Sequence, residues 1–216
     1  MKPQMPASSR SDEAASQLRS EIFSGAAEPR SLLAESAVAQ RLGVSRVPVR
    51  EALFTLEREG LVQFSASGRA FVKELAPQDF EELFTLRLAL EPLAARLATS
   101  TLRDNAVSLE KNITATRRAK SVQEVTQLDL EFHELILEAS GNARLLNLWR
   151  SLRGELQLWL GRLHRTHHSQ TRATREQTVE AHSEVLQYFK NQTSNACERL
   201  MRDHIQGWRE RLPLSP

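Results

Sequence analysis

From Gln78 to Arg211 the chain consists of segments in which apolar residues recur with the period of an α-helix. Short breaks separate the segments, and neither a strand signal nor an internal repeat interrupts them. Helices of this length bury their apolar faces against one another, so this half is predicted to be an all-helical bundle. The expected helices are six, at about 78–100, 102–119, 121–139, 142–165, 172–190 and 193–211.

A different order of elements precedes the bundle. Residues 1–11 are polar and are expected to form a flexible arm. Three helices and two strands then follow up to residue 74, and residues 75–77 read as a linker. Helix, helix, tight turn, helix and hairpin is the order of a winged helix-turn-helix. The sequence thus predicts a mainly α protein with domains at 12–74 and 78–211. The elements of the first domain are expected at 12–24, 34–42, 45–59, 61–64 and 70–73.

Composition and charge narrow the class of protein. Hydrophobic residues make up 40% and charged residues 26%, which is typical of a folded chain. No apolar run approaches the roughly 20 residues of a membrane span, and the N-terminus lacks the apolar core of a signal peptide. The one cysteine, Cys197, excludes an intrachain disulfide, so a cytoplasmic location is expected. The net charge is only +2, so a nucleic-acid binder would have to gather its arginines on one surface.

Residues 42–53, with the sequence LGVSRVPVREAL, contain the predicted tight turn and the start of the third helix. Gly43 permits the turn, and the Ser45 hydroxyl is expected to cap the helix. Arg46 and Arg50 are four residues apart and therefore share one helix face, where arginine can read guanine or clamp phosphate. Arg69, beside Gly68 in the hairpin turn, could reach the minor groove or the backbone. The alternative is that these arginines are solvated surface residues.

Four titratable residues of the second domain fall on apolar helix stripes. Asp129 and His133 lie four apart on one helix, and His182 and His204 lie at the centres of two other stripes. Burying such groups without partners is expensive, and binding a common metal ion would satisfy all four. Three imidazoles and a carboxylate suit a divalent transition ion such as Zn, Ni, Mn or Fe. The alternatives are hydrogen-bonded core histidines and a salt bridge between Asp129 and an arginine.

Residues 42–53 resemble the GntR family of regulators, whose motif L-G-V-S-R-x-P-V-R-E-A-L they match at every fixed position. The resemblance implies that residues Ser45, Arg46 and Arg50, together with the region of the wing glycine Gly68, contact operator DNA. Two positions depart from many relatives: Ser36 replaces an arginine, which removes one expected base contact. Val47 replaces a threonine and is expected to alter which bases are preferred.

Residues 78–211 resemble the FCD domain, the ligand-binding bundle of the FadR subgroup. The motifs that carry this resemblance are Leu86–Glu91, Asp129-x-x-x-His133, Gly141-Asn142, Glu180-Ala181-His182 and Met201-x-x-His204-Ile205. The resemblance implies a divalent metal held by Asp129, His133, His182 and His204, and an effector that is a small carboxylate or a sugar acid. Arg87 would clamp the effector carboxylate, unless it forms a surface ion pair with a nearby glutamate. Asn191-Gln192-Thr193 departs from the Gly-Asp pair that relatives carry.

These observations predict a ligand-responsive transcription repressor that is not an enzyme and has no membrane partner. It is expected to bind a pseudo-palindromic site in double-stranded DNA as a homodimer. The alternatives are a metal-dependent hydrolase or lyase with an accessory DNA-binding head, and an architectural DNA-binding protein without an effector. Among the remaining residues, a solvated loop is expected for one group of histidines, with a second metal site or pocket lid as the alternative: His164, His167 and His168. Packing roles are expected for Trp149, Trp159, Trp208 and Cys197.

Overall fold

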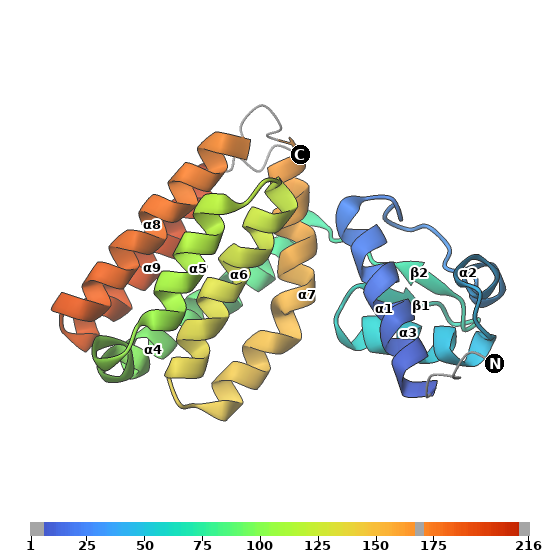
Figure 1. The fold of residues 1–216 in the computed structure, drawn as a ribbon, viewed down its shortest axis with the longest axis horizontal. Helices are drawn as coiled ribbons and strands as arrows, with labels where there is room; N and C mark the ends of the chain where they lie inside the picture. Colours follow the sequence, from blue (N-terminus) through green and yellow to red (C-terminus); the bar gives the residue numbers. More distant parts are fainter. Residues whose placement is uncertain (1–6, 167–170, 212–216) are drawn as a thin grey trace. The chain divides into compact units, whose positions relative to one another are not determined.

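The computed structural model describes residues 7–166 and 171–211, and the side chains of residues 10–161 and 172–207. The chain divides into two compact units, Met1–Leu75 and Ala76–Pro216 (Figure 1). In the described residues both units are dominated by helices, as the sequence predicts, and one two-stranded sheet lies in the first unit. No described helix has the length and apolarity that crossing a membrane requires.

The first unit has the order of a winged helix-turn-helix, which confirms the predicted fold. Its two strands pair antiparallel, with Val62 opposite Val72, and an isolated bridge joins Leu32 to Phe71. The first helix begins earlier than expected, because no helix breaker stands between Ala7 and Asp12. The elements are α1 (Ala7–Ser24), α2 (Glu35–Leu42), α3 (Arg46–Arg58), β1 (Val62–Phe64) and β2 (Ala70–Val72).

The core of the first unit lies between α1 and α3. Leu18 and Ile22 of α1 are buried, and α3 buries its whole predicted stripe of Val49, Ala52, Leu53 and Leu56. Arg19 of α1 donates two hydrogen bonds, of 2.8 and 2.7 Å, to the Glu59 carboxylate at the end of α3. For α2 the apolar spacing predicts that Ala37, Val38 and Leu42 face the core. Val38 is buried and Leu42 is half-buried, but Ala37 is exposed, so the prediction is partly wrong. The buried residues of this eight-residue helix are Val38 and Ala39.

The second unit is a bundle of helices in its described residues, as predicted. Pro77, assigned to the linker from the sequence, is the first residue of the first bundle helix, where its missing N–H costs no hydrogen bond. That helix runs on to Asp104 and ends where Asn105 turns extended. The helices are α4 (Pro77–Asp104), α5 (Val107–Arg118), α6 (Val122–Ala139), α7 (Ala143–Thr166), α8 (Thr171–Asn191) and α9 (Ser194–Arg211).

Helix α4 is the element on which the bundle is organised, since it packs against α6, α7, α8 and α9. Pro92 lies inside this helix and cannot donate the backbone hydrogen bond that the Leu88 carbonyl would otherwise accept. That carbonyl instead lies 3.4 Å from Nη1 of Arg202 on α9, within hydrogen-bond distance. Arg202 of α9 thus partly replaces the backbone hydrogen bond that is missing in α4. Pro92, which causes the gap, directly follows Glu91.

Candidate functional site

The turn between α2 and α3 shapes the exposed face of the first unit. Gly43 adopts a left-handed conformation, with φ of 65°, and ends α2. Ser45 occupies the N-cap position of α3, but its hydroxyl makes no capping hydrogen bond, so the expected cap is wrong. A cap hydroxyl accepts from the second or third N–H of the helix, and the third residue of α3 is Pro48, which has none. The exposed Ser45 hydroxyl therefore remains free to meet a phosphate.

The first turns of α3 present polar and apolar side chains to solvent. Arg46 is exposed, and the Arg50 side chain is 65% exposed. Arg50 has only loose partners, with Nε 3.8 Å from a Glu35 carboxylate oxygen and its guanidinium carbon 5.8 Å from the centre of the Phe54 ring. Val47, between the two arginines in the sequence, is 64% exposed.

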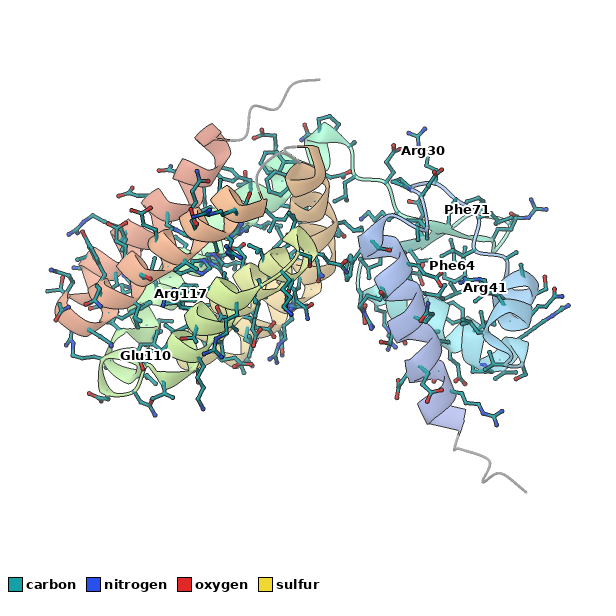
Figure 2. The ribbon with its side chains drawn as sticks, turned by 45° about the horizontal axis from the view of Figure 1, so that its top comes forward. Arg30, Arg41, Phe64, Phe71, Glu110 and Arg117 are labelled. Carbon is teal, nitrogen blue, oxygen red and sulfur yellow. The ribbon has the colours of Figure 1, made fainter. Side chains whose placement is uncertain are left out.

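The hairpin turn that follows β1 presents a further arginine. Gly68 has φ of 74°, and its N–H donates to the Ser65 carbonyl at 2.8 Å. The Ser65 hydroxyl accepts from the backbone N–H of Arg69, whose side chain is exposed. The ring of Phe64 of β1, labelled in Figure 2, stacks on the ring of Phe54 of α3 with centres 5.0 Å apart, which fixes the hairpin to the helix.

In the second unit the structure brings Asp129, His133, His182 and His204 together. Asp129, His133 and His182 are buried, and His204 is half-buried. Nε2 of His204 lies 3.4 Å from Nε2 of His133, and Nε2 of His182 lies 3.1 Å from Oδ1 of Asp129. One ring nitrogen from each histidine falls within a common group 4.8 Å across. Three helices, α6, α8 and α9, contribute these side chains.

The donor atoms of this cluster fit a metal ion. Among the described residues, Oδ1 of Asp129 and both ring nitrogens of His182 are buried without a hydrogen bond, although His182 and Asp129 are close. Unsatisfied buried acceptors are costly. Two ligand atoms, each about 2.1 Å from a shared ion, are about 3.0–3.4 Å apart, which matches the two observed separations. Phe132 stacks on the His182 ring at 3.8 Å and fixes its plane.

Glu91 of α4 supports this cluster, and the sequence analysis assigned it no role. Its carboxylate is 1% exposed and lies 2.6 Å, through Oε2, from Nδ1 of His133. Oε1 accepts hydrogen bonds from Trp149 at 2.9 Å and from Arg87 at 2.7 Å. A carboxylate at Nδ1 holds that nitrogen protonated and leaves Nε2 as the ligating atom. The available signal was the i, i+4 spacing of Arg87 and Glu91 on a helix with buried neighbours.

Arg87 lies in the interior and not in a surface ion pair. Its side chain is 7% exposed, and Nε and Nη2 point at the Glu91 carboxylate, at 2.7 and 3.4 Å. The glutamate partner was foreseen as an alternative, but its burial was not. Arg87 is also close enough to Asp129 to influence its ionisation. The guanidinium therefore belongs to the same buried polar cluster as the histidines.

The electrostatics of the cluster favour ionised carboxylates at Asp129 and Glu91 and neutral imidazoles at His182 and His204. Burial raises the pKa of the Asp129 carboxyl, but His182, His133 and Arg87 outweigh it and hold that pKa well below its ordinary value. Burial also raises the pKa of the Glu91 carboxyl, but Arg87 and His133 outweigh this effect and hold that pKa well below its ordinary value. Burial lowers the pKa of His182, despite Asp129, and that of His204. Metal ligation requires these protonation states.

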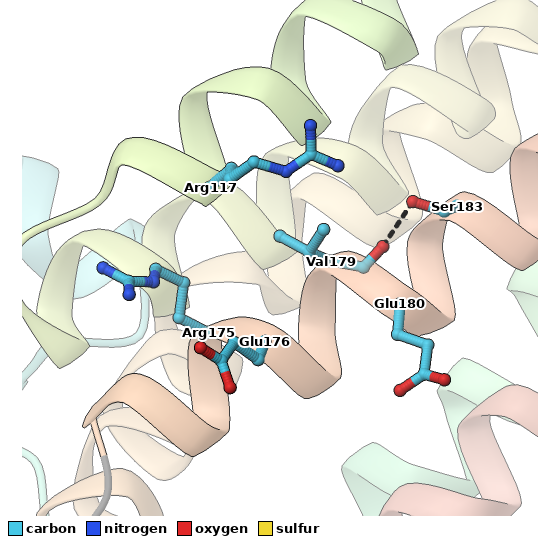
Figure 3. Close-up of a pocket in the computed structure, with 6 residues that line it drawn as sticks. All are labelled: Arg117, Arg175, Glu176, Val179, Glu180 and Ser183. Carbon is cyan, nitrogen blue, oxygen red and sulfur yellow. Dashed lines mark hydrogen bonds between the residues drawn. The ribbon is translucent and has the colours of Figure 1, made fainter.

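Two hollows lie in the described part of the second unit. An open one of about 430 Å³ is lined by residues of both charges: Arg117 of α5 lies across from Arg175, Glu176 and Glu180 of α8 (Figure 3). Its mixed charge selects no ligand class, and none of the histidines lines it. A second, nearly filled hollow of about 10 Å³ adjoins Arg87. Its other walls are Phe80, Phe84, Leu156, Trp159, Leu160 and Ile205.

The remaining residues singled out from the sequence fall into three groups. Trp149 and Cys197 are buried, as expected for packing residues, and Trp149 also donates to Glu91. Trp159 is half-buried and stacks on Phe80 at 4.0 Å. Four of the residues singled out from the sequence have side chains outside the described part of the chain: His164, His167, His168 and Trp208.

Sequence comparison relates the chain to regulators of bacterial operons. The uncharacterized HTH-type transcriptional regulator YdhC of Bacillus subtilis (strain 168) is 33% identical over 137 residues, 61% of each chain. The gluconate operon transcriptional repressor of Bacillus licheniformis is 28% identical over 68% of this chain and 61% of its own length. The chain thus spans about three fifths of these two relatives. The Nta operon transcriptional regulator of Aminobacter aminovorans is 28% identical over 82% of each chain.

Solved structures share the fold. E. coli McbR/YncC aligns with a TM-score of 0.72 and 20% identity, over 94% of this chain and 96% of that chain. A putative transcriptional regulator GntR from Rhodococcus sp. RHA1 aligns with a TM-score of 0.68 and 22% identity, over 94% and 97%. The model of bacterial regulatory proteins of the gntR family matches residues 10–72, and the FCD domain model matches residues 82–207. The chain therefore belongs to the gntR family of bacterial regulatory proteins, with an FCD domain in its second unit.

Proposed function

We propose that this chain is a DNA-binding transcription repressor whose affinity for its operator is set by an acidic ligand bound beside a metal ion. The observation that carries the DNA-binding role is the exposed face of α3. Arg46 and Arg50 project from the first turns of the helix, and the uncapped Ser45 hydroxyl stands at its positive N-terminal end. The hairpin adds Arg69 at a turn held open by Gly68. Repression is supported by two relatives named as repressors.

The metal is proposed to be held by Asp129, His133, His182 and His204. When bound, the ion supplies a Lewis-acidic centre for a ligand oxygen. The residues of this chain do the rest: the four ligands fix the ion, and Glu91 orients His133. Arg87 adds a positive charge at the side of the cluster where an acidic ligand would arrive. An unprotonated Asp129 and neutral histidines are the states that favour this arrangement.

A homodimer is proposed as the DNA-binding form, because one short recognition helix reads too few bases to be specific. Helix α4 offers a surface for it. Leu86 and Leu97 are 43% and 41% exposed, and Leu90 and Leu93, between them, are half-buried. The spacing of 4, 3 and 4 residues places all four within about 60° on one face. The spacing of these leucines is the same in both directions along the helix. In an antiparallel pair of copies, Leu86 would therefore lie opposite Leu97 of the other copy.

One experiment tests the core of this proposal. Nickel-loaded full-length protein is mixed with fragments of its own promoter region in gel shifts, with and without candidate carboxylic acids. A retarded band that an acid releases supports the proposal. Specific binding that no acid alters, in protein that takes up no nickel, would instead indicate an architectural DNA-binding protein. Footprinting would show two half-sites, about one helical turn apart or a multiple of it.

A further inference from the structure

We propose that the acidic ligand is a monocarboxylate with an apolar body, an acyl or aryl acid, and not a sugar acid or a dicarboxylate. The inference rests on the proposed ligand-responsive function and names the chemistry of the ligand. Two independent observations lead to it: the balance of charge in the buried cluster, and the walls of the hollow that adjoins Arg87.

With a divalent ion bound, one added negative charge would balance the charges of the buried cluster. Arg87 contributes one positive charge. Glu91, which pairs with Arg87, and Asp129, which would ligate the ion as a carboxylate, contribute two negative charges. Imidazoles that ligate a metal are neutral. A divalent ion would therefore leave one net positive charge in a region nearly closed to solvent, which one carboxylate neutralises. A second carboxylate would bring an unpaired negative charge into the interior, at a large desolvation cost.

The side chain of Arg87 belongs both to the polar cluster, through its contact with Glu91, and to the wall of the apolar hollow. Glu91 engages Nε and Nη2, which leaves Nη1 as the nitrogen that a ligand carboxylate would meet. The same side chain lines the hollow, whose other six walls are all apolar or aromatic. Ile205, next in the chain to His204, forms part of these walls. A carboxylate bound at Arg87 would therefore place the body of its molecule against apolar surface.

The walls discriminate between ligand bodies. Hydroxyl groups moved from water to this surface would lose hydrogen bonds without finding partners, whereas burial of methylene or aryl groups there would strengthen binding. The free space, about 10 Å³, holds about one water molecule. An acyl or aryl group must therefore part the 4.0 Å stack of Trp159 on Phe80. Trp159 is half-buried and is the wall residue with most freedom to move outward.

The test is isothermal titration of nickel-loaded full-length protein with five probes: butanoate, hexanoate, phenylacetate, gluconate and succinate. At least one of the three apolar monocarboxylates is expected to bind ten times or more tightly than gluconate and succinate. Its binding should also change tryptophan emission, and the change should disappear in Trp159→Phe, which keeps the wall apolar and leaves the other two tryptophans in place.

A matched pair of variants separates the apolar wall from the carboxylate site. Trp159→Phe should keep the affinity for the best apolar acid within about threefold, and Trp159→Gln should lose tenfold or more. If Trp159→Gln does not fold, the emission change and its loss in Trp159→Phe decide. Tighter binding of gluconate or succinate, or nickel-loaded protein that binds none of the apolar acids, overturns the inference. Tighter binding of gluconate or succinate would still agree with the proposed ligand-responsive regulator. Protein that binds neither nickel nor operator DNA would contradict the proposed regulator itself.

Discussion

Pro48 shows how one residue can set the chemistry of a helix end. It removes one of the two N–H groups that a Ser45 cap could use, and the hydroxyl makes no capping hydrogen bond, so the hydroxyl and the remaining N–H groups at the start of α3 stay available to an anion. The sequence predicts a helix start at Ser45, but a cap predicted from the serine alone neglects the N–H that Pro48 lacks. The same two residues, considered together, predict an uncapped helix end.

Arg50→Ala is expected to weaken specific operator binding by about 1–3 kcal/mol, if the side chain reads a base. The protein itself should remain as stable, because the Arg50 side chain is mostly exposed and its nearest carboxylate oxygen is 3.8 Å away. Fluorescence anisotropy with labelled operator measures the effect. Arg58→Ala, at the other end of α3, serves as the control and should bind nearly as wild type. An unchanged affinity in Arg50→Ala would remove this residue from the interface.

Glu91→Gln should weaken metal binding by about 10–100-fold, because His133 loses the carboxylate that fixes its tautomer. It should also destabilise the second unit by about 3–5 kcal/mol, since it leaves Arg87 buried without its counter-charge. Metal competition titrations and thermal melts measure the two effects, and the absorption of the cobalt-substituted protein reports ligand geometry. Glu138→Gln, which removes a surface partner of Arg150, is the control and should change neither quantity appreciably.

At the scale of elements, periodicity predicted most of the fold. The helices and the hairpin follow from local signals: apolar spacing, glycines at helix ends and polar turns. The histidine stripes also predicted that Asp129, His133, His182 and His204 would converge, because each lies on the buried face of its own helix. The role of Glu91 was not predictable in this way. It depends on the packing of α4 against α6 and α7, which no periodicity within α4 reports.

Helix α4 also provides a prediction about assembly. Replacing Leu86 and Leu97 together by lysine should convert a dimer to the mass of one chain in light scattering, because an antiparallel pairing would set the two lysines of opposite copies against each other. Helicity should remain, since both side chains are about two-fifths exposed in the chain described. Val107→Lys, at a similarly exposed apolar residue of α5, is the control. A double variant that remains dimeric would place the interface elsewhere.

For the whole molecule, a bound metal should act as a fold stabiliser. A ligand that binds only the folded state adds about 2.7 kcal/mol to stability at 100 times its dissociation constant. Nickel or zinc should therefore raise the melting temperature of the chain, and a chelator should reverse the rise. The response should vanish in a variant with both His133→Ala and His204→Ala, which lacks two facing donors 3.4 Å apart. An equal rise in that variant would show that the ion binds elsewhere.

The two halves of the molecule are joined in sequence by α4, which begins at Pro77, directly after the first unit ends at Leu75. Arg87 and Glu91 lie on this helix and belong to the proposed metal and ligand site, so a ligand that displaces Arg87 acts on the helix that follows the first unit in the chain. Such coupling requires unequal ligand binding to the two DNA-affinity states and is reciprocal. Operator DNA should therefore change ligand affinity by the same factor as ligand changes operator affinity.

His182→Ala tests this coupling directly. It removes a proposed metal ligand whose ring is fully buried, but leaves Arg46 and Arg50 of the first unit untouched. The variant should bind operator with near wild-type affinity and fail to release it when the best-binding acid is added. Gel shifts on wild type and variant, with and without that acid, measure both properties, and circular dichroism confirms that the bundle has folded. If His182→Ala releases operator as the wild type does, the metal has only a structural role and the signal reaches α4 by another route.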